Sequence, residues 1–257
     1  MTATTDFLSS ALRGALPPES WKWLEGASTE VARGAGLDRF CGLVSLSSRY
    51  VPRRGGFTWT PTQLAHASKL VEGWNPERWT KLEAARALLV LSRPDLSTPG
   101  GAAAVEESFR YADMGELCAL YKTLALLPEP KRFVWRAGEG CRSSMKAVFE
   151  SVACDTPLPV RQFDDVAWRQ MLIKALFVEA PLARVFGLES RLDSETARMA
   201  LDLADERRSA GRPVNPDSWR LVGKHGGARG LASLEREIAS GTPAGKQAAS
   251  EVLARSR

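Results

Sequence analysis

Apolar residues recur mostly at three- and four-residue spacing along this chain, and that period predicts an all-α fold. Alternating strand patterns are confined to short pieces near residues 43–50 and 57–59, so no substantial sheet is expected. Short connections between the apolar segments favour antiparallel helical pairs. The predicted helices lie near residues 19–33, 37–47, 61–73, 76–92, 101–110, 113–126, 130–153, 163–179, 193–210, 215–224, 227–239 and 243–255.

Five dipeptides mark candidate helix starts, because each places a side-chain acceptor directly before a proline. The acceptor can cap free backbone amides, and proline at the first helical position loses no hydrogen bond. The five are Thr60-Pro61, Asn75-Pro76, Thr98-Pro99, Asn215-Pro216 and Thr242-Pro243. Gln63 follows Thr60 at the spacing of a capping box.

These elements predict a single all-helical domain over residues 16–257, preceded by a loosely ordered segment over residues 1–15. The last two helices, with a Gly-Thr-Pro turn at 241–243 between them, are typical of a stacked helical hairpin. We therefore expect HEAT-like, helical-repeat stacking. The tryptophans in the first hundred residues are interpreted as packing anchors; they include Trp21, Trp23, Trp74 and Trp79.

Composition and charge exclude several classes of protein. The chain has 257 residues, of which 44% are hydrophobic and 25% charged, as in an ordinary globular protein. Its net charge is +5, and residues 205–257 hold ten Lys/Arg against six Asp/Glu, but these cations are spread out. Nucleic-acid binding needs a concentrated patch, so none is expected. Neither a membrane span nor an export signal is visible, and we expect a cytoplasmic protein.

Metal and thiol chemistry have little support in the sequence. Cys41, Cys118, Cys141 and Cys154 stand alone, without a Cys-x-x-Cys pair, and the chain has only two histidines. A zinc site needs closely spaced Cys and His ligands. We therefore expect no metal and no cofactor, and we interpret the cysteines as structural.

The predicted helix 163–179 carries polar groups within an apolar arc. Val166, Ile173 and Phe177 belong to this arc, and Gln170 and Lys174 fall in its middle, one turn apart. A buried, unpaired ammonium is costly, so an acidic group or a ligand should meet Lys174. The alternative is that its stem follows the core while its head reaches water. The sequence leaves both interpretations open.

The predicted helix 130–153 has a related pattern, with Arg136 and Glu139 on its polar stripe. Arg142 projects between Phe149 and Trp135, where an arginine can stack on rings and hold an anion. The alternative is an i,i+3 pair with Glu139, which contributes only a few tenths of a kcal/mol. From both helices we predict a ligand-binding set without a catalytic residue: Arg136, Glu139, Arg142, Gln170 and Lys174.

Three blocks of the chain, in the same order, resemble the EboA family. They are LALLPEPKRFVWRAGEGCRSSM at 124–145, FDDVAWRQMLIKALF at 163–177, and the pieces ARMALD and AGRPVNPDSWRLV within 197–222. The resemblance covers about residues 110–240. It implies a metabolite traffic protein encoded in an ebo gene cluster, with prenyltransferase-like, hydrolase-like and isomerase-like proteins as partners.

These observations and the family resemblance support three alternative hypotheses about function. The first is a non-catalytic accessory protein that assists transfer of a cytosolic precursor or product of secondary metabolism toward the periplasm. The second is a helical-repeat scaffold that binds partner enzymes of the same cluster through Arg220, Lys224 and Arg229. The third is an enzyme that uses Lys174 and Glu139 as base and acid.

Overall fold

The computed structural model of the chain describes residues 2–53, 55 and 57–255, and these residues form helices without any β-strand. The prediction of an all-α fold is confirmed. Contacts within the chain group it into two compact units, Met1–Gln162 (unit 1) and Phe163–Arg257 (unit 2). The sequence predicted a single domain over residues 16–257.

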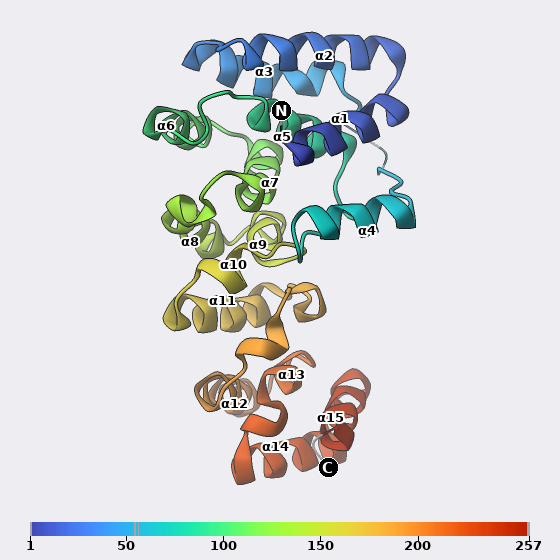
Figure 1. Cartoon of the computed structure of the whole chain (residues 1–257). Coiled ribbons are helices and arrows are strands. Elements are labelled where there is room, and N and C mark those ends of the chain that lie inside the picture. Colours follow the sequence, from blue (N-terminus) through green and yellow to red (C-terminus); the bar gives the residue numbers. More distant parts are fainter. Residues whose placement is uncertain (1, 54, 56, 256–257) are drawn as a thin grey trace. The chain divides into compact units, whose positions relative to one another are not determined.

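Unit 1 is built from α-helices and two short 3₁₀ helices (Figure 1). Their bounds are α1 (Ala3–Ala15), α2 (Pro18–Ala32), α3 (Leu37–Tyr50), α4 (Pro61–Leu70), α5 (Lys81–Leu91), α6 (Pro99–Ser108), α7 (Met114–Thr123), η1 (Leu124–Leu126), η2 (Pro130–Phe133), α8 (Val134–Arg142), α9 (Lys146–Ala153) and α10 (Leu158–Gln162).

Helix α5 is the central helix of unit 1. A capping box at Thr80 and Glu83 starts it, and every residue from Ala84 to Leu91 is buried. Figure 1 shows it among its neighbours, and it packs against α1, α2, α3 and α7. Arg86 is the one charged residue in this buried stretch, at 2% exposure. It pairs with Glu116 of α7.

The first helix corrects one expectation. Residues 1–15 were predicted to be loosely ordered, yet α1 begins at Ala3, with Thr2 as its N-cap. Leu8 and Leu12 on α1 are fully buried, and the helix packs on α4 and α5. Burial of these apolar side chains accounts for the order of this segment.

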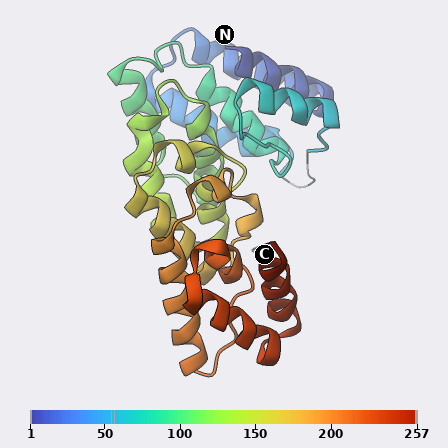
Figure 2. The same ribbon diagram turned by 60° about the horizontal axis from the view of Figure 1, so that its bottom comes forward.

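Unit 2 has its own buried core, which contains Trp168 and Trp219. Its helices are α11 (Asp165–Val178), η3 (Leu182–Arg184), η4 (Leu188–Arg191), α12 (Ser194–Ser209), α13 (Ser218–Val222), η5 (Gly223–His225), α14 (Gly227–Ser240) and α15 (Pro243–Arg255). The predicted hairpin of the last two helices is present, because α14 and α15 pack side by side (Figure 2). HEAT-like stacking of the whole chain stays a prediction.

The predicted helix starts with threonine differ in hydrogen bonding from those with asparagine. The threonines at 60, 98 and 242 precede α4, α6 and α15, and each hydroxyl accepts a hydrogen bond from the backbone amide three residues on. Asn75 and Asn215 instead accept from the amide two residues on, at 3.0 Å in both cases. This hydrogen bond to the second amide closes a short turn and does not cap the start of a long helix. The helix predicted at 76–92 therefore starts late, at Lys81.

The long helix predicted over residues 130–153 is broken into η2, α8 and α9. The break lies at Ser143, whose hydroxyl accepts a hydrogen bond from the Met145 amide at 3.1 Å. Serine side chains compete with helical hydrogen bonds in this way. Gly140 of α8 then lies against Val152 of α9, so the two short helices pack closely.

Candidate functional site

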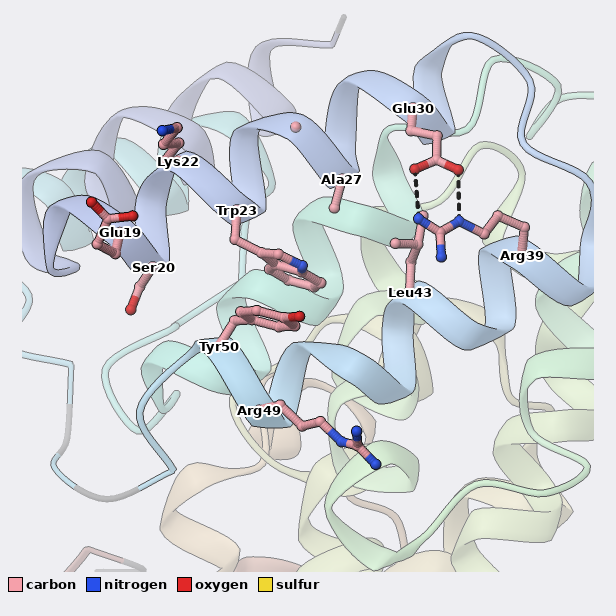
Figure 3. Close-up of a pocket in the computed structure, with 11 residues that line it drawn as sticks. Glu19, Ser20, Lys22, Trp23, Ala27, Glu30, Arg39, Leu43, Arg49 and Tyr50 are labelled. Carbon is pink, nitrogen blue, oxygen red and sulfur yellow. Dashed lines mark hydrogen bonds and ion pairs between the residues drawn. The ribbon is translucent and has the colours of Figure 1, made fainter.

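An open groove between α2 and α3 is the main candidate site of unit 1 (Figure 3). It has a volume of about 670 Å3, within the usual range of small-molecule sites. Both helices present a stripe of side chains to it at one-turn spacing. The lining residues are Glu19, Ser20, Lys22, Trp23, Gly26, Ala27 and Glu30 from α2, and Arg39, Leu43, Arg49 and Tyr50 from α3.

A stacked aromatic pair forms the middle of the groove. The rings of Trp23 and Tyr50 lie 4.5 Å apart between centroids and are nearly parallel, at 6°. Figure 3 shows the two rings face to face, one from each helix. Tyr50 is 47% exposed and Trp23 is half-buried, so the pair offers apolar surface at the molecular boundary. Aromatic rings held in this way suit a planar or apolar part of a ligand.

The rest of the groove combines an apolar floor with charged side chains. Ala27 and Leu43 are buried at 5% and 2% exposure and form the floor beside the aromatic pair. Glu19, Lys22 and Arg49 are exposed, and none of the three forms an ion pair with a described residue. These groups can therefore meet polar parts of a ligand without first breaking a salt bridge.

An ion pair closes the far end of the groove (Figure 3). Arg39 donates from Nε to Glu30 Oε1 at 2.7 Å and from Nη2 to Oε2 at 2.9 Å. The hydrogen bonds from Arg39 lower the pKa of Glu30, and those to Glu30 raise the pKa of Arg39. Both groups thus stay charged around neutral pH. The bidentate contact fixes the spacing of α2 and α3 at this end.

Gly26 widens the groove, because a Cβ at this position would meet no atom within 4 Å. Glycine inside a helix is destabilising relative to alanine. Gly26→Ala should therefore raise the free energy of unfolding by about 0.5–1 kcal/mol in urea titrations.

Gly140→Ala is the matched control for this prediction. A Cβ there would lie 2.5 Å from Val152 Cγ2 and 2.8 Å from the Tyr121 ring. Such overpacking should lower the free energy of unfolding by about 1–3 kcal/mol. A loss of stability in Gly26→Ala would mean that neighbouring side chains already occupy this part of the groove.

The five residues predicted from sequence belong to two different units. Arg136, Glu139 and Arg142 lie in unit 1, whereas Gln170 and Lys174 lie in unit 2. None of the five lines the α2–α3 groove. Their role in ligand binding stays a prediction.

Arg136 is held by structural contacts on α8. Its Nε donates to Glu106 Oε2 at 2.7 Å. Its guanidinium lies 4.9 Å from the ring centroids of both Phe109 and Trp135. This arginine thus links α8 to α6.

Of the two interpretations left open for Arg142, the structure supports the i,i+3 pair with Glu139. Arg142 forms an i,i+3 ion pair with Glu139, and its side chain is 67% exposed. Arg142 has no cation–π contact with a ring of the described residues, Trp135 lies against Arg136 instead, and Phe149 is fully buried on α9. The expected aromatic anchor is therefore wrong. The break at Ser143 explains the difference, since the two rings no longer share one helix.

The apolar arc predicted around Lys174 is also wrong. Val166 and Phe177 are 60% and 55% exposed, whereas Trp168 and Leu172 on another side of α11 are buried. Apolar residues occupy both sides of this helix, and the large indole of Trp168 belongs to the buried one. Lys174 is half-buried and has no ion pair among the described residues, and Gln170 is exposed.

The tryptophans of the first hundred residues have different roles. Trp74 and Trp79 are buried at 1% and 4% exposure, as expected of packing anchors. Trp23 instead lines the groove, which the sequence analysis missed. Its partner Tyr50 is 27 positions away on another helix, so local periodicity could not pair them. The available signal was Gly26, an unexplained glycine one turn from Trp23.

The described residues contain no group of three or more His, Cys, Asp or Glu side chains placed to hold a metal ion. All four cysteines are free thiols. Burial raises the pKa of Cys141 to about 12, which makes it a poor nucleophile near neutral pH. Within the described part of the chain, no helix combines the length and apolar character needed to cross a membrane.

Comparison with known proteins gives one match. A family model described as "Metabolite traffic protein EboA" matches residues 4–223, a range that begins within the first turn of α1 and includes the groove. The resemblance seen in the sequence began only near residue 110, so the match extends it to the N-terminal part. No curated protein and no solved structure matched. Because the match covers most of its length, the chain belongs to the EboA family of metabolite traffic proteins.

Proposed function

We propose that this chain is a non-catalytic accessory protein of a secondary-metabolite pathway, which binds a small metabolite in the α2–α3 groove. In this role it works in the cytoplasm and passes a precursor or product toward export to the periplasm. The family description as a metabolite traffic protein supports the general role. The groove supports the binding step.

The observation that carries the proposal is the combination of an aromatic stack, an apolar floor and unpaired charges in one groove. Small-molecule sites commonly pair apolar and aromatic walls with a few polar groups that orient the ligand. Here Trp23 and Tyr50 suit an apolar or planar part, and Lys22 and Arg49 suit an acidic or hydroxylated part. An open groove also lets a ligand leave without opening of a lid, which suits transfer to a partner.

The test blocks the groove and asks which small molecules the protein retains. The purified chain is incubated with the small-molecule fraction of cells that make the metabolite, and bound compounds are identified by mass spectrometry. The variant Gly26→Trp places a large side chain in the groove. We expect a compound retained by the unchanged chain to be lost from this variant.

Gly14→Trp is the matched control, because Gly14 on α1 is exposed, has free space around it and does not line the groove. Equal retention by all three proteins, or by none, would contradict the proposal. A further variant neutralises the five residues predicted from sequence, Arg136, Glu139, Arg142, Gln170 and Lys174. Loss of the compound from that variant alone would move the binding site to those residues.

A scaffold function is the second candidate. Tyr111, Met114 and Trp135 of unit 1 are large apolar side chains at 82%, 54% and 64% exposure, and such surface often marks protein contacts. Its partners would be the prenyltransferase-like, hydrolase-like or isomerase-like proteins of the cluster. Retention of such a protein, without any small molecule, in the same experiment would favour this function.

Two of the other residues assigned a role from the sequence already have ion-pair partners. Arg229, expected to contact a partner, already pairs with Asp202 and Asp205 at 2.7 Å each. Glu139, the acid of the enzyme alternative, pairs with Arg142. Both residues would have to exchange these partners before acting.

A further inference from the structure

A second cavity lies wholly within unit 2, where α13, η5 and α15 pack together. It has a volume of about 260 Å3 and is more enclosed than the α2–α3 groove. Arg220, Lys224, His225 and Arg255 line it, against a single carboxylate, that of Glu189. Without counting His225, the three cations and one anion leave two positive charges in excess.

Several basic side chains in this cavity lack partners, as do Arg212 and Arg236 elsewhere in unit 2. Other arginines of unit 2 are matched to carboxylates, including Arg169, Arg191, Arg198, Arg208 and Arg229. Lys224, His225 and Arg255 have no hydrogen bond or ion pair from their side chains to any described residue.

Arg220 is only weakly matched. Its Nη2 lies 3.7 Å from Oε1 of Glu189, and the Glu189 side chain is 70% exposed. Exposed pairs of this kind contribute about 0–1 kcal/mol, so an incoming anion can replace the carboxylate at little cost. The guanidinium of Arg220 is thus available to a ligand in the cavity.

The size and remaining walls of the cavity limit what can enter. Leu192 and Val252 add apolar surface beside the cations. The volume is below the usual range for small-molecule sites, so it fits a compact group rather than a polymer. A nucleic-acid strand needs an extended basic track, which so compact a cavity does not provide.

We propose that the unit 2 cavity binds the phosphate group of a small phosphorylated molecule, with a short apolar part against Leu192 and Val252. A phosphate monoester carries about 1.5 to 2 negative charges at pH 7, which matches the excess of positive charge. Arginine and lysine are the common partners of such a group. This site goes beyond the proposed function of the α2–α3 groove and does not depend on it.

The experiment measures binding of butyl phosphate to the full chain by isothermal titration calorimetry, with butanol as the uncharged probe. The test variant is Lys224→Gln/Arg255→Gln. Since charge-assisted hydrogen bonds are lost, we expect affinity for butyl phosphate to fall about 10- to 100-fold or more. Both side chains are exposed and form no hydrogen bond or ion pair with a described residue, and circular dichroism verifies the fold.

Arg212→Gln/Arg236→Gln is the control, because it removes the same net charge from exposed positions outside the cavity. We expect its affinity for butyl phosphate to equal that of the unchanged chain. An equal loss in both variants, or no saturable binding at all, would overturn the proposal.

A second arm distinguishes a soluble phosphate from a lipid headgroup. It measures sedimentation of the chain with phosphatidylcholine vesicles that contain phosphatidic acid. Loss of binding in the test variant supports the cavity in either arm, and the arm with the larger loss identifies the source of the phosphate. Binding unaffected by the test variant in both arms contradicts the assignment. Because this experiment uses other probes and other variants than the groove experiment, its result is independent of that one.

Discussion

Arg86→Met is expected to lower the free energy of unfolding by about 3–5 kcal/mol, because it leaves a buried carboxylate without its cation. Arg86 Nη2 lies 3.3 Å from Glu116 Oε1, and the two side chains are only 3% and 10% exposed. Arg86 Nε also donates to Ser47 Oγ at 3.2 Å. One side chain thus joins α3, α5 and α7, and urea unfolding followed by circular dichroism measures its loss.

Two comparisons separate the buried pair from a general effect of losing an arginine. Arg110→Met removes an exposed i,i+3 pair with Glu107 and should cost less than about 1 kcal/mol. Arg86→Met/Glu116→Gln removes the uncompensated charge and should recover part of the stability. Equal losses for Arg86→Met and Arg110→Met would show that the interior pair is not stabilising unit 1.

In unit 2, Arg208→Met is expected to have an effect of similar size, about 3–5 kcal/mol. Arg208 Nη2 donates to Glu237 Oε2 at 3.0 Å, and the two side chains are 12% and 4% exposed. Its Nη1 donates to Ser233 Oγ at 2.7 Å, and its guanidinium lies 5.2 Å from the Trp219 ring centroid. The substitution therefore removes the buried contact between α12 and α14 and leaves the exposed pairs of Arg229 with Asp202 and Asp205.

Hydrogen–deuterium exchange locates this effect. Exchange of backbone amides in α12 and α14 should accelerate in Arg208→Met, because the buried carboxylate of Glu237 then favours opening toward water. The control is Arg198→Met, whose exposed pairs with Glu195 and Asp202 should contribute less than about 1 kcal/mol. If exchange in α14 stays unchanged, the Arg208–Glu237 contact does not limit opening of this region.

The helical class of the fold could be predicted because caps and periodicity are local signals. Thr60, Thr98 and Thr242 each cap the helix that follows, as expected. Asn75 and Asn215 carry the same type of signal but close short turns. An amide side chain can bond the second or the third amide beyond it, and the sequence does not say which.

The pairings that stabilise the core could not be predicted, because they join distant positions. A lone arginine in the apolar run around Arg86 signals a buried partner. That partner, Glu116, is 30 positions away and also accepts a hydrogen bond from the Asp113 amide at 3.0 Å. The local spacing of Glu116 from Asp113 indicates only a role at the start of α7. The buried pair escaped detection for that reason.

For the candidate site too, local signals could be predicted from the sequence and contacts between distant positions could not. The family could be recognised from three local blocks, but Trp23 and Tyr50 meet only after α2 and α3 pack. For α11, apolar residues on both sides left the buried face undetermined, and the wrong face was chosen. Ser143 then removed the long helix on which the Arg142 assignment depended.

The shape of the α2–α3 groove has a consequence for transport under the proposed function. A carrier site without a cover does not store free energy in closure, so it binds and releases its cargo reversibly, and the local concentrations set the net direction. Net flow would then come from an enzyme that supplies the compound and an exporter that removes it. In that arrangement the protein shortens the path between source and sink, and the gradient between them sets the direction.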